Sequence, residues 1–235
     1  VRVDDKANAL GVVVDGDDVR AGWFSTQQLV ESADWSIGFS LKVGQHLDSN
    51  GLAKLPIITV QNNASNYWEL YSVYDTATTC KLKIGATLNG SSASQIGDAG
   101  RAKDSTVNVV LTFNSTTNKL QLNVSDDADV EEITVAPVTD AKFTVEVLGN
   151  SVVTGNKISH IPHVVSNLTV YTGVLGSSAI TALYGNRTPA TSNLQNHYLL
   201  SAGGQAVSSE VTNDTDMLLC DPSPPVAAAD SIVFN

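Results

Sequence analysis

The chain is poor in charged residues, above all in basic ones. Of its 235 residues, 13 are Lys or Arg and 24 are Asp or Glu, which gives a formal net charge of −11. Charged residues make up 16% of the sequence, against roughly 25% in an ordinary soluble domain. Nucleic-acid binding depends on clustered basic side chains that neutralise phosphates. We therefore expect no nucleic-acid partner.

Long apolar runs are also missing. A membrane-spanning helix needs about 18 or more consecutive apolar residues, and no stretch of this sequence approaches that length, so we expect no membrane insertion. Cysteine is scarce as well, because only Cys80 and Cys220 are present and neither belongs to a CxxC motif. One long-range disulfide and two separate buried thiols are both compatible with these positions. Residues 1–5 contain no apolar signal segment, which fits either a trimmed Met or a removed leader.

Strand patterning, in contrast, is abundant. From Asp34 to Gly44 apolar residues such as Trp35 occupy every second position, which predicts a strand with one buried and one exposed face. Similar patterns predict further strands at 55–61, 67–74, 80–86, 106–114, 119–125, 132–136, 142–148 and 164–171. Turn-forming Gly, Asn, Asp and Ser residues separate them. The whole pattern predicts an all-β sandwich or jelly roll.

One segment carries a helical pattern, and the last part of the chain differs from the rest. Ser177 and Ser178 offer N-cap oxygens to a helix over residues 179–184, and Gly185 would end it. After Pro189 polar loops alternate with short apolar runs, too few to form a core of their own. We therefore predict a jelly-roll domain at 1–188 and a C-terminal extension at 189–235. The extension would pack on the sandwich or on a neighbouring subunit.

Four segments, in the right order, resemble the concanavalin A-like jelly roll in its laminin-G-like and pentraxin-like branch. They are the opening strand and acidic turn at 9–19, the WSIGFSLK strand at 35–42, the VVLTFN and KLQLNV hairpin at 109–124, and the closing strand and helix at 165–184. The resemblance implies a lectin-type β-sandwich with one short helix. The sequence departs from the family at Ser166-Asn167 and at Ala179, where the family has acidic residues.

The segment that follows the predicted helix carries a looser resemblance. Asn186-Arg187-Thr188-Pro189 and the polar extension are similar to the corresponding part of laminin-G-like structural proteins of tailed phages, especially marine ones. This similarity implies a protein of a virus particle.

A group of carboxylates suggests glycosidase chemistry. Asp127-Ala128-Asp129-Val130-Glu131-Glu132 is similar to the E-x-D-x-x-E motif of glucanases with this fold, whose first Glu is the nucleophile and whose last Glu is the acid/base. A retaining pair must lie about 5–5.5 Å apart. Asp127 is one methylene shorter than Glu, and the segment falls where the family has a hairpin turn. We interpret it as a solvated acidic turn and expect no enzymatic activity.

Aromatic and acidic side chains supply the candidate binding residues. In the strand at 67–74, Trp68 and Leu70 would face the core, so the other face is left for a sugar platform or a subunit interface. The residues on that outward face are Tyr67, Glu69 and Tyr71. Trp23 is a further candidate, with a plug in the core as its alternative role.

We expect the chain to bind no cofactor, with a calcium site as the alternative. Asp15, Asp17 and Asp18, in a Gly-containing turn, offer oxygens to Ca²⁺, which takes 6–8 oxygen ligands. The acidic residues at 126–129 offer similar ligands, but acidic turns without metal are commoner. His160 and His163 lack the third ligand of a zinc site, so we predict a Pro-fixed turn before the strand at 164.

These expectations support three functions, in order of preference. The first is a non-enzymatic structural protein at the virion surface, such as a capsid decoration or a tail or fibre component, whose partners are copies of itself or other virion proteins. The second is an extracellular or cell-surface carbohydrate-binding module that recognises cell-surface glycans. The third is a glycoside hydrolase of the same fold. Fold alone does not choose among them, because this sandwich hosts all three roles.

Overall fold

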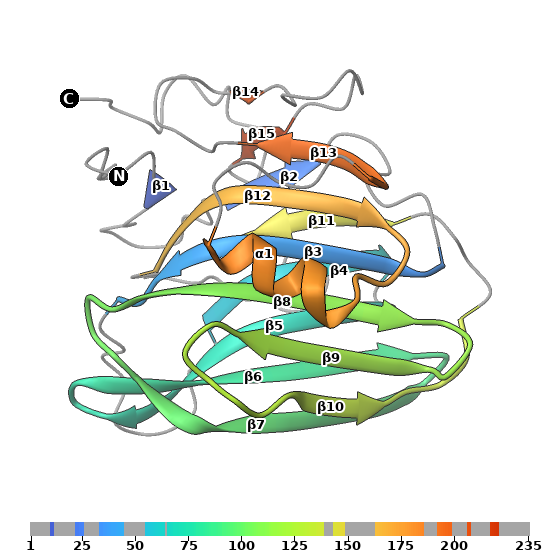
Figure 1. Ribbon diagram of the computed structural model, residues 1–235. Coiled ribbons are helices and arrows are strands. Elements are labelled where there is room, and N and C mark those ends of the chain that lie inside the picture. Colours follow the sequence, from blue (N-terminus) through green and yellow to red (C-terminus); the bar gives the residue numbers. More distant parts are fainter. Residues whose placement is uncertain are drawn as a thin grey trace.

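Two facing antiparallel β-sheets make up the computed structural model of the chain (Figure 1). The structure describes residues 10–11, 22–25, 33–44, 55–63, 65–138, 143–148, 163–185, 192–198, 206–207 and 217–220. Fifteen strands and one helix lie in these ranges, which agrees with the predicted all-β sandwich. In the described part of the chain no helix has the length and apolar character needed to cross a membrane.

One sheet has seven strands and carries the helix on its outer face. Its order is β1-β12-β3-β8-β9-β10, and β13 also pairs with β12. The strands are β1 (Leu10–Gly11), β3 (Trp35–Lys42), β8 (Thr106–Asn114), β9 (Lys119–Val124), β10 (Glu131–Thr134), β12 (Val164–Thr172) and β13 (Leu194–Tyr198). The β8–β9 hairpin lies where the sequence predicted it, and β3 and β12, whose pairing the sequence did not indicate, lie at predicted strand positions.

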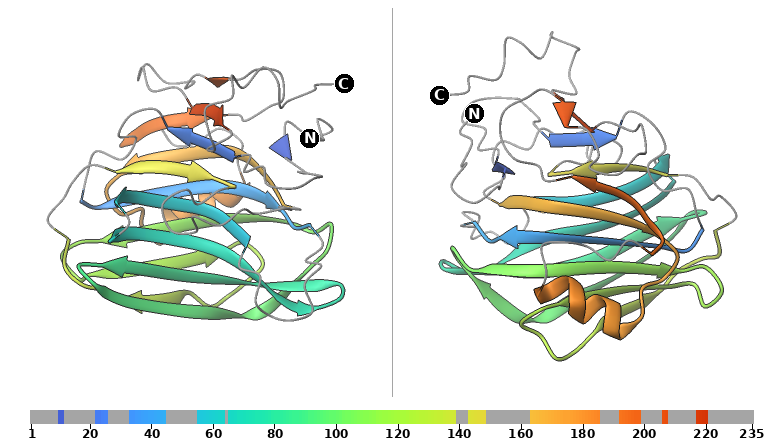
Figure 2. Two further views of the ribbon diagram at one scale, coloured as in Figure 1. Left: turned by 180° about the vertical axis from the view of Figure 1, so that it is seen from behind. Right: turned by 45° about the horizontal axis from the view of Figure 1, so that its top comes forward.

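The other sheet has eight strands in the order β14-β15-β2-β11-β4-β5-β6-β7. The strands are β2 (Gly22–Ser25), β4 (Leu55–Asn63), β5 (Asn66–Thr76), β6 (Thr79–Leu88), β7 (Ser91–Ala102), β11 (Thr144–Val147), β14 (Ala206–Val207) and β15 (Met217–Cys220). Seen from behind, β4 to β7 lie side by side (Figure 2). The sequence did not predict β7.

Aromatic side chains from both sheets meet in the core. Trp35 of β3 and Trp68 of β5 pack edge to face, with ring centroids 5.6 Å apart. Phe113 and Phe143 contact the Trp68 ring at centroid distances of 4.9 and 4.7 Å. Such edge-to-face and tilted geometries are favourable for aromatic pairs. The predicted core positions Trp35, Trp68 and Leu70 are confirmed, because each is at most 1% exposed.

The helix α1 (Ser177–Gly185) packs on the outer face of the seven-stranded sheet (Figure 1). It begins earlier than predicted, because the backbone amides of Ala179 and Ile180 both donate to the carbonyl of Gly176. Ser177 and Ser178 are therefore in the first turn. At the other end, Asn108 of β8 donates its Nδ2–H to the carbonyl of Tyr184 at 2.9 Å, which satisfies an acceptor that the helix leaves open.

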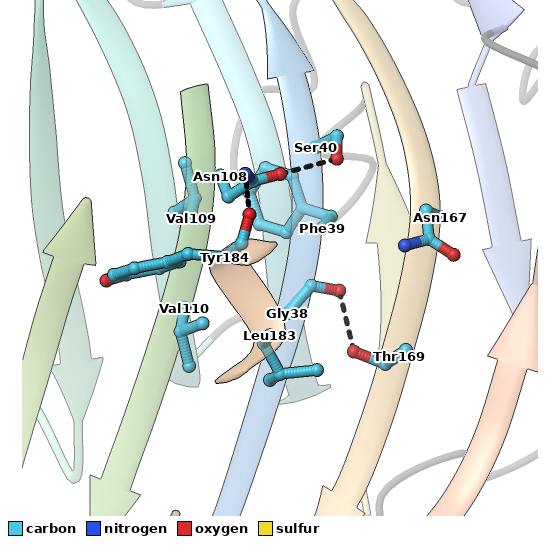
Figure 3. A pocket seen from close by; sticks show the side chains of 10 residues that line it. All are labelled: Gly38, Phe39, Ser40, Asn108, Val109, Val110, Asn167, Thr169, Leu183 and Tyr184. Carbon is cyan, nitrogen blue, oxygen red and sulfur yellow. Dashed lines mark hydrogen bonds between the residues drawn. The ribbon is translucent and has the colours of Figure 1, made fainter. Parts of the chain in front are cut away.

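A small cavity lies between α1 and the sheet (Figure 3). Its volume is about 10 Å³, which is room for about one water molecule. Ser40 donates to Asn108 Oδ1 at 2.7 Å on one side of it, and Thr169 Oγ1 donates to the Gly38 carbonyl at 3.1 Å on another. The cavity therefore belongs to the packing of the helix and is too small to hold a sugar.

Strands from beyond residue 188 belong to both sheets. β13 pairs with β12, β15 pairs with β2, and β14 pairs with β15. Tyr198, at the end of β13, is fully buried in the core cluster. Part of the C-terminal extension thus completes the sandwich, and a contact of this extension with a neighbouring subunit remains a prediction.

Candidate functional site

The three candidates on β5 lie on the face of the eight-stranded sheet that points away from the core. Tyr67, Glu69 and Tyr71 alternate along the strand with Trp68 and Leu70, which are core residues. Their exposed fractions are only 9%, 6% and 6%. The strand alternation that the sequence indicated is therefore present, but these side chains expose only a rim to solvent.

Tyr67 belongs to a row of polar side chains that crosses four strands. In the register of the sheet, Gln61 of β4 pairs with Tyr67, Tyr67 with Thr87 of β6, and Thr87 with Ser92 of β7. Thr87 Oγ1 donates to Tyr67 Oη at 3.0 Å, and the Thr87 and Ser92 hydroxyls are 2.9 Å apart. Gln61 is 8% exposed, and its buried Oε1 accepts no hydrogen bond from any residue that the structure describes.

Tyr71 and Glu69 occupy the next positions along the same face. The Lys83 ammonium lies 5.6 Å from the centre of the Tyr71 ring, within cation–π range. Burial raises the pKa of Tyr71 well above its ordinary value, and the nearby Glu69 and Tyr67 add to the rise. The phenol is therefore neutral at physiological pH. Gly85, opposite Glu69, makes room for that carboxylate, because a Cβ at Gly85 would lie 3.1 Å from Glu69 Oε1.

This face becomes more exposed toward β6 and β7. Lys83 and Thr87 are half-buried, and Ser92 is exposed. We call Tyr67, Tyr71, Lys83, Thr87 and Ser92 the β5–β7 strip. It combines two aromatic rings with four hydroxyl groups, two of them phenolic, and one ammonium group, all on one sheet face. Groups of this kind can contact the apolar face of a ring and hydrogen-bond its polar edge.

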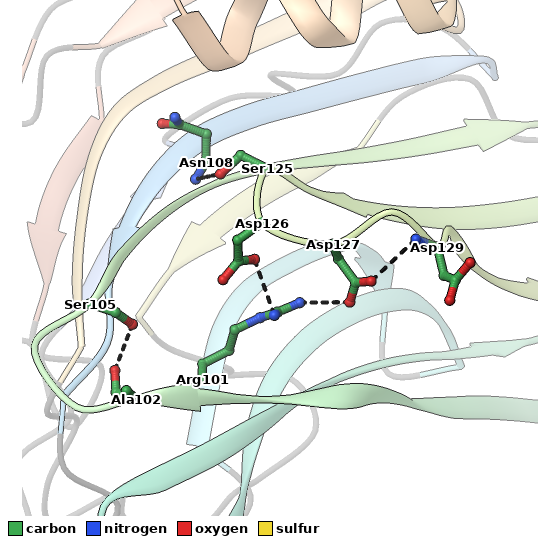
Figure 4. A network of polar contacts seen from close by, with 8 residues as sticks. All are labelled: Arg101, Ala102, Ser105, Asn108, Ser125, Asp126, Asp127 and Asp129. Atoms are coloured by element: carbon green, nitrogen blue, oxygen red, sulfur yellow. Dashed lines mark hydrogen bonds and ion pairs between the residues drawn. The ribbon is translucent and has the colours of Figure 1, made fainter.

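The acidic segment after β9 is bound to an arginine of the other sheet (Figure 4). Arg101, near the end of β7, lies 2.8 Å from Asp127 and 3.1 Å from Asp126. A hydrogen bond from the Asp129 amide, followed by the contacts with Arg101, lowers the pKa of Asp127 below its ordinary value. The first part of the segment, up to residue 130, forms the predicted turn, whereas Glu131 and Glu132 belong to strand β10, and Asp127 is paired rather than simply solvated.

The two glutamates at the end of this segment are on β10 and are also bound. Glu132 forms an ion pair with Lys119 at 2.5 Å and accepts a hydrogen bond from Gln121 at 2.7 Å. Both contacts lower the pKa of Glu132, the one with Lys119 most. Glu131 accepts a hydrogen bond from Gln95 of β7. A glycosidase acid must hold its proton near neutral pH, whereas Asp127 and Glu132 are both held ionised.

Several of the other candidates fall partly or wholly outside the described ranges. Asp15, Asp17 and Asp18 lie outside them, and so does His160. The backbone of Trp23 pairs with Val147 and Leu219 in the sheet, but its side chain is not among those described. Within the described residues no group of three or more His, Cys, Asp and Glu side chains could hold a metal ion.

The structure describes the side chain of Cys80 but only the backbone of Cys220. Cys80 is a free buried thiol, so of the two alternatives that the sequence left open, it is a separate thiol and not part of a long-range disulfide. Burial raises the pKa of Cys80 to about 11, so the thiol is protonated and unreactive at neutral pH. Cys220 lies in β15, and its side chain is not described.

A Ser–His pair, which the sequence did not indicate, lies in the core. His163 Nε2 is 2.6 Å from Ser72 Oγ, and both residues are fully buried. The other ring nitrogen, Nδ1, accepts a hydrogen bond from the Gly44 amide at 3.1 Å. Nε2 of the neutral ring must therefore carry the proton, and it cannot act as a base toward the serine. The pair is structural in this geometry.

Comparison with known proteins identifies the fold. No family model matches the chain, and no curated protein sequence matches it. Among solved structures, a heptameric SAP-like pentraxin from Limulus polyphemus superposes with a TM-score of 0.57 at 11% identity, covering 88% of this chain and 93% of the pentraxin. The enzymatically active domain of tailspike protein 2 of bacteriophage CBA120 gives a TM-score of 0.61 at 9% identity, covering 87% of this chain and 32% of the tailspike.

The chain has the concanavalin A-like jelly-roll fold. A third jelly roll, a Bacteroides ovatus protein to which carbohydrate binding is ascribed, has a TM-score of 0.52 at 11% identity. That match covers 89% of this chain and 59% of the other. The fold implied by the four sequence segments is thereby confirmed. At such low identities the comparisons establish the fold and leave the function to the residues of this chain.

Proposed function

We propose that the chain is a non-enzymatic, lectin-like jelly-roll domain that binds glycans through the β5–β7 strip. The observation that carries this proposal is the hydrogen-bonded row of Tyr67, Thr87 and Ser92 hydroxyls beside a second tyrosine on the same sheet face. A sugar has apolar ring faces and hydroxyl edges, and tyrosine offers a matching apolar ring and a polar oxygen. The strip therefore suits a polyhydroxylated ligand.

The unpartnered acceptor next to this row supports the same proposal. Gln61 Oε1 is buried, lies beside Tyr67 in the register and accepts no hydrogen bond within the described part of the chain. Leaving a buried polar atom unsatisfied costs about 1–3 kcal/mol. A hydroxyl donor would remove that cost, and a ligand hydroxyl or an ordered water molecule can supply it. Since the face is nearly covered at Tyr67, the ligand would enter from the exposed side, over Thr87 and Ser92.

The state of the carboxylates favours binding without hydrolysis. Asp127 and Glu132 both have a lowered pKa and are held by Arg101 and Lys119. Neither group is suited to donate a proton to a leaving sugar. We expect no reducing sugars to appear when the chain is incubated with laminarin or agarose.

A glycan array with the full chain, with calcium and with chelator, tests the proposal. We expect a set of glycans to bind the wild type and to bind Thr87→Val and Ser92→Ala at least about tenfold more weakly, since each variant removes one hydroxyl of the strip. Thr134→Val, an exposed position on β10 of the other sheet, is the matched control and should bind like the wild type. If the wild type binds no glycan under either condition, the proposal is wrong.

A role in a virus particle is the second candidate, favoured by the likeness to the phage tailspike. The chain would then be a structural protein at the virion surface, acting in assembly or attachment, with copies of itself or other virion proteins as partners. Mass spectrometry of particles purified from the source, together with light scattering of the full chain, tests this. A chain that is absent from such particles would contradict the virion role and leave an extracellular or cell-surface location for the domain.

A further inference from the structure

His163 connects three parts of the jelly roll from a fully buried position. The residue directly precedes β12, and its two ring nitrogens contact different segments. Nδ1 accepts a hydrogen bond from the amide of Gly44, which follows β3 in the seven-stranded sheet. Nε2 lies 2.6 Å from the Ser72 hydroxyl on β5, in the eight-stranded sheet. One imidazole thus joins the ends of two neighbouring strands to the opposite sheet.

This arrangement requires the neutral imidazole. A nitrogen that accepts a hydrogen bond from a backbone amide must offer a lone pair, so Nδ1 carries no proton. The proton is therefore on Nε2 and points to Ser72 Oγ. Protonation of Nδ1 would place two N–H groups against each other, break the contact with Gly44 and bury a positive charge between the sheets. The folded contact and the charged ring are incompatible.

The positions around His163 are mostly apolar. On its own sheet, the core-facing neighbours are Val165 of β12 and Leu41 and Val43 at the end of β3, all of them buried. On the opposite sheet, Leu55 of β4 and Leu82 of β6 pair with Ser72. Burial among such side chains disfavours a charged ring.

Few titratable or charged groups in the described part of the chain occupy core-facing positions on the elements packed against His163. On β5, β6 and β7 these are Tyr74, Cys80 and Arg101, which follow one another in the sheet register. Glu69, Lys81 and Lys83 lie at the alternate positions, on the outer face of the same sheet. Arg101 is itself a cation, and it is bound to Asp126 and Asp127. On β3, Lys42 pairs with Val164 of β12. Lys42 alternates with the core-facing Leu41 and therefore lies on the outer face of β3, and Arg101 is already paired with two carboxylates. Burial of the His163 ring, more than these cations, therefore disfavours its charged form.

We propose that His163 is an acid-sensitive latch, which joins the two sheets while its imidazole is neutral and releases them when it is protonated. An unconstrained imidazole takes up a proton near pH 6.5. The unfolded chain would bind that proton below this pH, whereas the folded chain must exclude it or lose the contact with Gly44. The latch therefore stabilises the fold above about pH 6.5 and loses its effect as the pH falls below that value. This device is independent of glycan binding.

Urea unfolding of the full chain between pH 8 and pH 5 tests the latch. We expect the unfolding equilibrium constant of the wild type to rise by up to about tenfold per pH unit below pH 6.5 relative to His163→Gln, because one extra proton binds on unfolding. The glutamine variant keeps a donor and an acceptor but does not titrate. His197→Gln is the matched control, since His197 is half-buried and its Nε2 contacts Asn167 Oδ1, an acceptor that tolerates a protonated ring.

Nuclear magnetic resonance of the wild type keeps the proposal testable if His163→Gln fails to fold. We expect the His163 ring nitrogens to show the neutral Nε2–H form below pH 6.5, and the Gly44 amide to lose hydrogen-exchange protection as the pH falls further. The proposal is overturned if the His163 ring becomes protonated near pH 6.5 while the Gly44 amide stays protected. It is also overturned if His163→Gln folds and shows the same pH dependence as the wild type and His197→Gln.

Discussion

Arg101 and Asp127 form a 2.8 Å ion pair that joins the last strand of the eight-stranded sheet to a turn of the seven-stranded sheet (Figure 4). Only 6% of the Arg101 side chain is exposed, against 16% of the Asp127 side chain. A second carboxylate, Asp126, binds the same guanidinium at 3.1 Å. The Arg101 guanidinium thus neutralises part of the negative charge of this acidic turn.

Replacing Arg101 should destabilise the sandwich. We expect Arg101→Gln to lower the free energy of unfolding by about 1–3 kcal/mol, less than the loss of a fully buried ion pair, because Asp126 is largely solvated. The measurement is urea unfolding at pH 7. Lys103→Gln, an exposed position in the following turn, is the control and should change the free energy by less than about 0.5 kcal/mol. Equal effects of the two substitutions would contradict the role given to Arg101.

The same ion pair predicts a loss of stability in acid. The pKa of Asp127 is lowered in the folded chain, so its stabilising effect is present above the unfolded value of about 3.9 and disappears as the pH falls through the lowered value. We expect Asp127→Asn to be less stable than the wild type at pH 7 and to approach it at about pH 3. Unfolding of both proteins at the two pH values measures this. An exposed control, Asp104→Asn, should follow the wild type at both.

The strands that local sequence patterns predicted are those with apolar residues at alternate or successive positions that pack in the core. β3 is an example, because its apolar residues alternate and pack directly in the core. β7 could not be found in this way, since residues 91–102 are mainly Ser, Ala and Gly and lack an apolar period. This strand is held by pairing with β6 and by side chains such as Gln95 and Arg101 that reach the other sheet. Those partners are distant in sequence, so no local pattern contains them.

In the candidate site, too, the local sequence pattern predicted the direction of the side chains but not their contacts with residues distant in sequence. The alternation along β5 correctly separated Tyr67 and Tyr71 from the core residue Trp68. It could not show that both tyrosines are nearly covered, because their cover includes side chains of the neighbouring strands, such as Thr87 and Lys83, whose pairing with β5 is not contained in the local pattern. The contact between Ser72 and His163 spans 91 positions. Only the three-dimensional arrangement of the two sheets brings this pair together.

Gly38 should be required where the helix packs on the sheet (Figure 3). A Cβ at this position would lie 2.8 Å from Thr169 Oγ1 and 3.4 Å from Leu183 Cδ1. We therefore expect Gly38→Ala to lower the free energy of unfolding by about 1–3 kcal/mol through overpacking. Gly185→Ala is the matched control, because a Cβ at Gly185 meets no atom within 4 Å. A Gly38→Ala melting temperature equal to that of the control would show that the helix shifts without cost.

Tyr198 decides whether the region beyond residue 188 is part of the sandwich or an appendage. Its side chain is fully buried in the core cluster, and its strand β13 pairs with β12. We expect Tyr198→Ala to lower the free energy of unfolding by about 3–5 kcal/mol, as for other large buried aromatic residues. Ser192→Ala, exposed just before the same strand, should have little effect. If Tyr198→Ala unfolds like Ser192→Ala, β13 is dispensable and the extension is free to contact a neighbouring subunit. If Tyr198→Ala is strongly destabilised, a chain that ends at Thr188 lacks part of its own core.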